Sequence, residues 1–304
     1  KKTFVVFFGI LLITWAFIAS TKLGIDPDDR FWNEAGVPLL NEQIFIALVI
    51  VVIILLFPLY FLGKAQNTPF ISGILKRRDL FIFIALWAIA AILWINEPLP
   101  DNFFAPGPYL PNYELSPYAD AAIYDIGGQF SLIGQGLVNS AFYDRALLPG
   151  LFAIFHLLVG QNYLAVITLQ TLLFASFIPI LYLIGKSLHS RLAGIFVATL
   201  AVFKVLNAIK SSTLILSVHP KFMLSEFLAS IFIALITLWL IRWAKEANSL
   251  HYFVLIGGML GVGIMLRANI FLFFPLIGIL LLLKFPKNWG TVFQSGFILI
   301  LAFF

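Results

Sequence analysis

The stretch FMLSEFLASIFIALITLWLI, residues Phe222–Ile241, carries one charged side chain, Glu226. A transmembrane helix needs about 20 consecutive, mostly apolar residues, because that length spans the hydrocarbon core of a bilayer. The apolar residues form a continuous run and do not alternate with polar ones, which favours a helix over a strand of a membrane barrel. This stretch therefore predicts a membrane-spanning helix.

Runs of the same kind recur along the chain, which is 62% hydrophobic and 11% charged, with a mean hydropathy of +1.03. Such a composition excludes an ordinary soluble globular protein. The predicted fold is an all-α, polytopic transmembrane helix bundle with about nine spans. The predicted spans are Thr3–Ser20, Ile44–Leu62, Leu80–Ile95, Tyr163–Gly185, Leu192–Ile209, Phe222–Ile241, Tyr252–Leu266, Ala268–Leu283 and a last one that begins near Gly290.

The start of the chain has two interpretations. Lys1 and Lys2 ahead of Thr3–Ser20 also fit a signal peptide, but this run is long for one and lacks a small-x-small cleavage site, so a retained helix is favoured. The chain starts without methionine and stops inside the apolar run Ile298–Phe304. We therefore expect it to be a piece of a longer protein, with a C-terminal part beyond this sequence.

Charge predicts the orientation in the membrane. The net charge of +5 is read as a sign of topology and not of nucleic-acid binding, and the lack of cysteine excludes disulfides and thiolate nucleophiles. Lys64 and the cluster Lys76–Arg78 lie between the second and third predicted spans, which places this connection in the cytoplasm. The N-terminus is then cytoplasmic, and the long segment 96–162 is extracytoplasmic. We expect the protein in the cell inner or plasma membrane.

The apolar segment Leu147–Gly160 is short for a span. If it crossed the membrane, the basic loop Lys186–Arg191 would lie outside. If it lies along the outer interface, this loop and the basic loops Arg242–Lys245 and Lys284–Lys287 all lie inside, as the positive-inside rule requires. We therefore predict an interfacial or re-entrant helix, on which His156 could be a buried, hydrogen-bonded side chain.

The segment SPYADAAIYDIGGQ, residues 116–129, is unusually polar for this chain. Asp120 and Tyr124 are four residues apart, so they share one face of a helix, whereas Asp125 points away from that face and is expected to be a bystander. A carboxylate beside apolar groups at the membrane surface suits a general base. The alternative is that Asp120 only begins a helix and is stabilised by the helix dipole.

Several cations lie at the outer ends of the predicted spans, on the side that the positive-inside rule disfavours. They are Lys204, Lys210, His219, Lys221 and Arg267. A cation there needs an anionic partner, either a lipid phosphate or the acidic external segment. We favour a phosphate-facing role for Arg267, and snorkelling to lipid headgroups for Lys210. Glu226 is expected to pair with Lys221, about one turn away.

The glycine-rich run LIGGMLGVG lies inside a predicted span. Its glycines predict close helix packing of the small-xxx-small kind; they are Gly257, Gly258, Gly261 and Gly263. The chain has no HExxH, Walker A or GxSxG motif. No cluster of metal ligands stands out either, so no metal site is predicted and a divalent-metal requirement is left open.

In order, the segments resemble the N-terminal half of the C-type (GT-C) integral-membrane glycosyltransferases. The branch they are most similar to contains the protein O-mannosyltransferases and the lipid A aminoarabinose transferases. The motifs are the external Asp-x-x-x-Tyr helix, the turn SLIGQG, an Arg…Pro helix, a Gln-bearing span ending in LYLIGKSL, Ser-Glu at a span start, and GGMLGVGIMLRANIFLFFP. The resemblance covers about residues 80–285. It implies two extra N-terminal helices in 1–79 and a C-terminally truncated core in 80–304, with the catalytic loop at 96–162.

The resemblance implies transfer of a sugar from a polyprenyl-phosphate carrier, with inversion at the anomeric carbon, on the extracytoplasmic face. Asp120 would then deprotonate the acceptor hydroxyl, and Tyr124 would shape the pocket. Many relatives have Asp-Glu where this chain has Asp120-Ala121, so a scheme with two carboxylates is in doubt.

The carrier-binding residues are also implied by the resemblance. Arg267 would stabilise the departing polyprenyl phosphate, with Lys210 and Lys221 as helpers. Arg145 and Pro149 match the Arg-Pro interfacial helix, although relatives often have two prolines there. The implied partners are membrane lipid, the polyprenyl-phosphate sugar donor and a glycan, lipid or protein acceptor. No resident cofactor and no nucleic acid are expected.

Two other classes of function remain open. A non-catalytic accessory or structural membrane subunit would keep the fold and lose the chemistry, and the missing Glu beside Asp120 is compatible with that. A lipid-carrier flippase or transporter would need ionisable side chains near the middle of the membrane and an internal repeat. Lys204 is the single candidate charge well inside a predicted span, and no repeat is evident.

Overall fold

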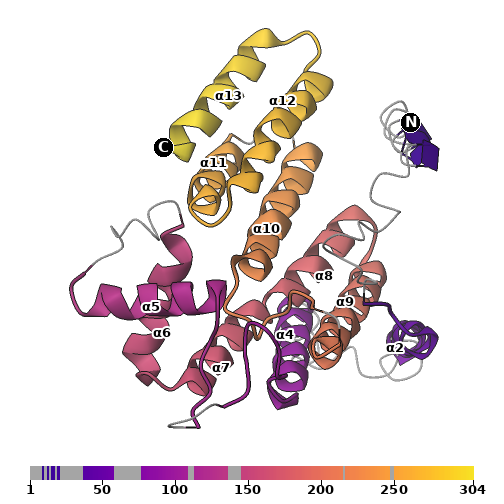
Figure 1. Ribbon diagram of the computed structural model, residues 1–304. Coiled ribbons are helices and arrows are strands. Elements are labelled where there is room, and N and C mark those ends of the chain that lie inside the picture. Colours follow the sequence, from indigo (N-terminus) through magenta and orange to yellow (C-terminus); the bar gives the residue numbers. More distant parts are fainter. Residues whose placement is uncertain are drawn as a thin grey trace. The chain divides into compact units, whose positions relative to one another are not determined.

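A computed structural model describes residues 37–57, 77–108, 113–135, 145–214, 216–246 and 250–304, together with a few single positions between 9 and 20. The contacts divide the chain into two units, Lys1–Gly36 and Val37–Phe304, and the helices α2 to α13 belong to the second. The described part is all-helical, apart from an isolated β-bridge between Asn102 and Ala105 (Figure 1).

In its described residues, the second unit contains α-helices and one short 3-10 helix, which follow one another along the chain. They are α2 (Asn41–Phe57), α4 (Arg78–Asn96), α5 (Asp120–Leu132), α6 (Leu147–Val159), α7 (Tyr163–Phe174), α8 (Phe177–Leu188), α9 (Arg191–Ser211), α10 (Ser225–Lys245), α11 (His251–Ile264), the 3-10 helix η2 (Ala268–Leu272), α12 (Phe273–Lys284) and α13 (Trp289–Phe303).

Within the described residues, four helical stretches are long and apolar enough to cross a membrane. These are α4, the combined stretch Tyr163–Leu188 of α7 and α8, α9 and α10. Helices of this length and composition are typical of a membrane protein. The other described helices are shorter, at 10–17 residues, so the structure supports four spans where the sequence predicts about nine. The predicted span Thr3–Ser20 lies largely outside the described residues.

Aromatic side chains hold the four long helices together. Trp94 of α4 is fully buried, and its indole Nε1–H donates to the carbonyl of Val202 in α9 at 3.4 Å. Its ring also meets Phe227 of α10 edge-on, with ring centroids 6.0 Å apart, and Phe227 stacks on Phe174 of α7 at 5.3 Å. Burial of such large rings dominates core energetics, so this cluster fixes how the four helices meet.

The direction of the helices decides where the segment between α4 and α7 joins the bundle. Trp87 in α4 donates to the carbonyl of Leu172 at 2.8 Å, and Asp79 at the start of α4 accepts from Tyr182 Oη at 2.7 Å. Since the later residue of one helix meets the earlier residue of the other, α4 runs antiparallel to α7 and α8. The excursion between α4 and α7, which contains α5 and α6, thus leaves and rejoins the bundle at one end.

The opposite end of α4 is fixed by a charge cluster. The Asp79 carboxylate accepts from Arg191 Nε at 2.7 Å and from Arg191 Nη2 at 3.0 Å, and it lies 2.7 Å from Lys186 Nζ. Arginine binds a carboxylate through two parallel hydrogen bonds, which adds geometric precision to the contact. Asp79 therefore joins the start of α4 to the end of α8 and the start of α9.

The predicted close packing of the glycine-rich helix is confirmed at two positions of α11. A Cβ on Gly257 would overlap the carbonyl oxygen of Leu299 in α13, and a Cβ on Gly261 would overlap that of Phe303. The backbones of α11 and α13 approach closely because these residues have no side chain.

We predict that Gly257→Ala lowers the free energy of unfolding by about 1–3 kcal/mol, because the new methyl group forces α11 away from α13. The matched control is Gly278→Ala in α12, where no heavy atom lies within 4 Å of the added Cβ. That change should be neutral or stabilise by up to about 1 kcal/mol, since alanine is the better helix former. Denaturant unfolding in detergent micelles, followed by tryptophan fluorescence, measures both, and equal losses would contradict the close packing.

Candidate functional site

Asp120 is the first residue of α5, and its side chain is exposed. In the described part of the chain its carboxylate has no hydrogen bond or ion pair, so it is open to solvent and to a ligand. The residue before it, Ala119, has a φ of 53°, in the left-handed region that non-glycine residues rarely adopt. Strained backbone of this kind costs about 1–3 kcal/mol and is concentrated at active sites and ligand clamps.

Tyr124 and Arg145 are in direct contact. The Tyr124 side chain is buried one turn after Asp120, and its hydroxyl oxygen accepts from Arg145 Nη1 at 3.1 Å. This bond joins α5 to the residue pair that leads into α6. The Arg145 and Tyr124 of the predicted site are therefore neighbours across the α5–α6 contact.

Asp125, which the sequence predicts to be a bystander of the proposed chemistry, makes a buried structural contact. Its side chain is buried between α5 and α6, with the residue 6% exposed, and its Oδ1 lies 2.8 Å from Nε2 of His156, which is 5% exposed. The other oxygen, Oδ2, accepts from Gln129 Nε2 at 2.8 Å. The sequence signal for this pair is weak, because the two residues are 31 positions apart and no local spacing connects them.

The hydrogen bonds of His156 determine how many protons the pair holds. Its Nδ1 lies 2.9 Å from the carbonyl oxygen of Gly160, an atom that can only accept, so Nδ1 carries a proton. One further proton must then lie between Nε2 and the Asp125 carboxylate, on either atom. The pair is thus a charge-neutral unit overall, which is how a buried acid and base can be kept away from water at acceptable cost.

Gly128, three residues after Asp125, lets α6 approach. A Cβ on Gly128 would lie 2.8 Å from Cβ of Phe152 and 2.9 Å from the backbone nitrogen of Ala153. Such distances are too short for any side chain. The polar segment that the sequence shows at 116–129 is therefore the packing surface for α6 as well as the location of Asp120.

We predict that Asp125→Leu and His156→Leu each lower the free energy of unfolding by about 3–5 kcal/mol, because each leaves a buried polar partner unsatisfied. The double variant should lose at least about 1 kcal/mol less than the sum of the two single losses, since it removes both partners together. Denaturant unfolding of the three variants and the parent gives this coupling energy. Strictly additive losses would show that the two side chains do not depend on each other.

Lys210 and Lys221 both reach Glu97, at the end of α4. Lys210 Nζ lies 3.1 Å from Glu97 Oε1, while the buried Lys221 donates to the backbone carbonyl of Glu97 and, at 3.2 Å, to that of Ile95. Burial lowers the pKa of Lys221, and the Glu97 carboxylate partly opposes this. A lysine at a helix C-terminus satisfies carbonyls that have no intrahelical partner, so Lys221 caps α4.

Arg267 forms an ion pair with Glu226, which corrects the expectation that Glu226 pairs with Lys221. The physical reason is that Lys221 turns to the carbonyls of α4, while the turn between α11 and η2 brings Arg267 to the start of α10. Glu226 Oε2 is buried and, among the described residues, has no hydrogen-bond partner. A carboxylate at the first turn of α10 is also favoured by the helix dipole.

The loop before α10 is held by buried polar groups. Gln170 of α7 donates to the carbonyls of Pro220 and Phe222, at 2.6 and 2.8 Å. His219 is fully buried against Phe222; its Nδ1 accepts from the Lys221 backbone N–H at 3.2 Å, so its Nε2–H faces Ser212 Oγ, also at 3.2 Å. Burial, reinforced by Lys221, lowers the pKa of His219 to about 3.

The buried His219 makes stability depend on pH. Its pKa is 6.5 for an ordinary histidine and about 3 in the fold, so the unfolded chain binds the extra proton throughout this window. Stability therefore falls as the pH drops below about 6.5, by about 1.4 kcal/mol per pH unit down to about pH 3. We predict that His219→Gln removes this part of the slope, while the exposed His251→Gln keeps it; unfolding midpoints between about pH 4 and about pH 6, a range within that window, are the measurement. An unchanged slope in His219→Gln would contradict this assignment.

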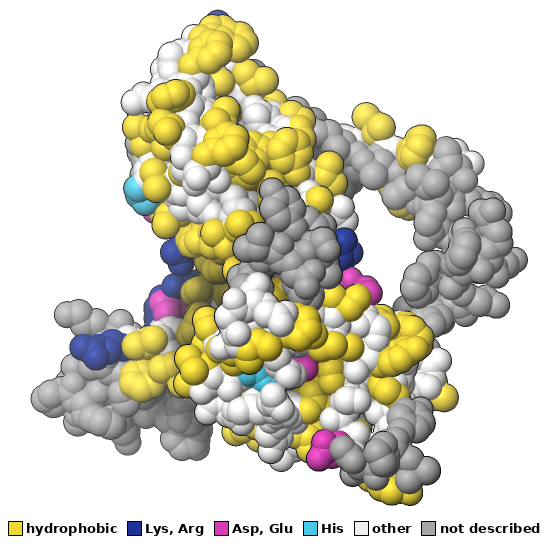
Figure 2. Space-filling view, turned by 60° about the vertical axis from the view of Figure 1, so that its left-hand side comes forward, with side chains coloured by type: hydrophobic (Ala, Val, Ile, Leu, Met, Phe, Trp, Pro, Cys, Tyr) yellow, Lys and Arg dark blue, Asp and Glu magenta, His cyan; other side chains and the backbone are white. Residues whose placement is uncertain are grey.

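The described residues contain no group of three or more His, Cys, Asp or Glu side chains that could hold a metal ion. On the face shown in Figure 2, some of the acidic side chains lie beside basic ones, and hydrophobic side chains cover much of the remaining described surface. This pattern fits the individual contacts, in which the basic side chains of the predicted site have acceptors within the chain.

Five of the six residues of the predicted site fall into three separate sets of contacts. Tyr124 touches Arg145, Lys210 and Lys221 meet at Glu97, and Arg267 pairs with Glu226. In the described residues no hydrogen bond or ion pair joins Asp120 to the other five. Comparisons of the chain with protein-family models, with curated proteins and with solved structures find no match.

Proposed function

We propose that this chain is an integral-membrane glycosyltransferase of the GT-C type, which moves a sugar from a polyprenyl-phosphate carrier to an acceptor hydroxyl at the extracytoplasmic face. The observation that carries the proposal is Asp120, an exposed carboxylate at the start of α5, next to the strained Ala119. A helical bundle with four membrane-spanning lengths of helix is compatible with such an enzyme.

In the proposed reaction Asp120 accepts the proton of the acceptor hydroxyl. The hydroxyl oxygen forms a bond to the anomeric carbon while the bond from that carbon to the carrier phosphate breaks, and the phosphate leaves with the electron pair. Attack opposite the leaving group inverts the anomeric carbon. A positioned general base of this kind contributes about 10²–10⁴-fold to the rate.

The leaving phosphate needs positive charge. Lys210 and Arg267 suit this role because their side chains are 57% and 34% exposed and each can exchange a carboxylate for a phosphate. Lys221 is buried on the carbonyls of α4, so we assign it a positioning role for Glu97 and Lys210. Tyr124 and Arg145 would form the wall beside Asp120, held by the Asp125–His156 pair behind them.

A second function is favoured by one observation. Lys210, Lys221 and Arg267 already have acceptors inside the chain, so none of them requires a phosphate for its stability. An accessory membrane subunit that keeps the fold without the chemistry would have the same contacts. The two functions differ in whether Asp120 is needed for transfer.

We predict that Asp120→Asn lowers the rate of sugar transfer by about 10²–10⁴-fold, because asparagine cannot accept the proton, and leaves unfolding unchanged. The control is Glu114→Gln, which neutralises another exposed carboxylate of the same external segment. The assay follows labelled sugar from polyprenyl-phosphate mannose or aminoarabinose in proteoliposomes. Full activity of a folded Asp120→Asn variant would refute the role of Asp120, and an inactive parent with every donor would favour the accessory subunit.

A further inference from the structure

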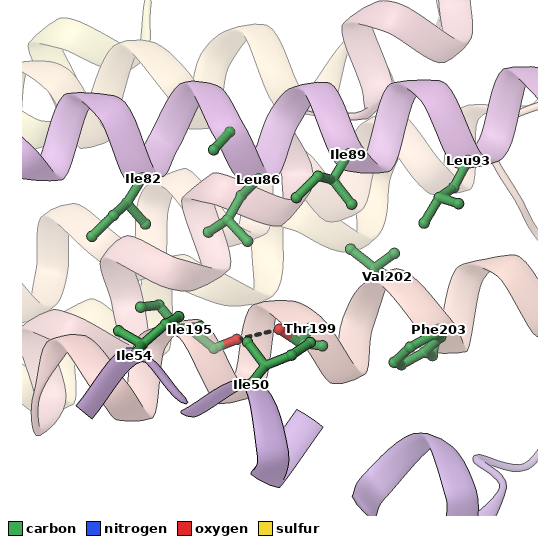
Figure 3. A pocket seen from close by; sticks show the side chains of 11 residues that line it. Ile50, Ile54, Ile82, Leu86, Ile89, Leu93, Ile195, Thr199, Val202 and Phe203 are labelled. Atoms are coloured by element: carbon green, nitrogen blue, oxygen red, sulfur yellow. Dashed lines mark hydrogen bonds between the residues drawn. The ribbon is translucent and has the colours of Figure 1, made fainter. Parts of the chain in front are cut away.

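An apolar groove of about 250 Å³ runs between α2, α4 and α9. Figure 3 shows that α4 contributes a row of side chains that point toward α9, namely Ile82, Leu86, Ile89 and Leu93. The facing walls come from Ile50 and Ile54 of α2 and from Ile195, Thr199, Val202 and Phe203 of α9. The groove is therefore formed by three helices, α2, α4 and α9.

The lining of the groove suits a hydrocarbon chain. Thr199 supplies the one hydroxyl among the lining residues, and this hydroxyl donates to the carbonyl of Ile195 at 2.9 Å (dashed line in Figure 3). Its hydrogen is therefore already used within α9 and needs no acceptor on a ligand. A groove without free polar groups cannot orient a headgroup or a sugar. It can make van der Waals contacts with methylene groups along its length.

The length of the groove matches one leaflet of a bilayer. The row from Ile82 to Leu93 rises about 16 Å at about 1.5 Å per residue. The hydrocarbon core of a bilayer is about 30 Å thick, so the row covers about half of it. One acyl chain of a lipid fills this depth, whereas a long polyprenyl chain would extend well beyond it.

One end of the groove carries charge. Glu97 continues the α4 row one turn after Leu93, and Lys210 continues the α9 face about two turns after Phe203. The two side chains meet at 3.1 Å, so the ion pair lies above the end of the groove. Lys210 is 57% exposed there and can take a second anion.

We propose that this groove binds a membrane phospholipid, with one acyl chain between α2, α4 and α9 and the lipid phosphate at Lys210. The bound lipid fills the space between α2 and α4. α2 itself is held to α9 by a reciprocal pair of amide hydrogen bonds, from Gln43 to Asn207 at 2.7 Å and back at 2.8 Å. The lipid is a structural component that stabilises the position of α2. The inference does not need the proposed transferase activity, but it assigns Lys210 to the lipid phosphate, so that Arg267 is left to contact the carrier phosphate of the proposed reaction.

The affinity of the groove for a phospholipid must come from close packing and from charge. Lipid tails are as apolar as the lining side chains, so moving a chain from the bilayer into the groove gains little from the hydrophobic effect. Selective binding therefore requires close packing along the row of α4 and the charge-assisted contact of the phosphate with Lys210.

The test is a titration of the delipidated protein in detergent with a diacyl phosphatidylglycerol, followed by native mass spectrometry. Ile89→Trp fills the groove from α4, where Ile89 is 50% exposed, and should weaken binding about tenfold. Ile92→Trp is the matched control: it lies on the same helix, is 59% exposed and does not line the groove. Its binding should stay within about twofold of the parent.

The charge is tested separately, by a variant that does not depend on core packing. Lys210→Gln should weaken binding about tenfold, whereas Lys287→Gln, an exposed lysine after α12, should not change it. Binding of Ile89→Trp and Lys210→Gln at the parent's affinity would overturn the proposal. So would co-purification of a polyprenyl phosphate that is displaced by Ile89→Trp. Loss of sugar transfer in Asp120→Asn has no bearing on this readout, so the two proposals can fail independently.

Discussion

The hydrogen bond between Asp125 and His156 is the contact on which the segment between α4 and α7 depends. α5 is joined to α6 through this buried pair, and His156 is in turn fixed to the carbonyl of Gly160, at the turn that leads into α7. Two side-chain contacts thus connect α5 with the turn that precedes α7. Asp120 and Tyr124 lie on α5, so the position of the candidate site depends on a buried pair that does not itself face the solvent.

Hydropathy predicted the class of fold because a helix that crosses lipid must be apolar along nearly all of its length. The predicted span Phe222–Ile241 and the observed α10, Ser225–Lys245, differ by a few residues at each end. The break at Arg267 between two predicted spans is present in the fold, where α11 ends at Ile264 and the 3-10 helix η2 precedes α12. Both helices are shorter than the about 20 residues that cross a bilayer. Hydropathy shows how apolar a run is, and not how many of its residues join one helix.

Side-chain partners were predicted only where they are local. The spacing of Gly257 and Gly261 indicates a packing face without any knowledge of the partner helix, and α13 occupies that face. Glu226 was assigned to Lys221 by spacing, but the lysine caps α4 and the glutamate binds Arg267, both through contacts distant in sequence. The contact of Asp125 was not predicted for the same reason, since its partner His156 lies on the next helix. Helical spacing compares residues within one helix only.

The shared proton of the buried pair has an electrostatic consequence for the surface of α5. A carboxylate and an imidazole that together hold one compensating proton act on their surroundings as a dipole, whose field falls off more steeply with distance than that of a charge. α5 has two acidic residues in its first six positions, yet Asp125 adds no net charge to the field around the helix. An anionic substrate that approaches this surface would meet the repulsion of one carboxylate, that of Asp120, and not of two.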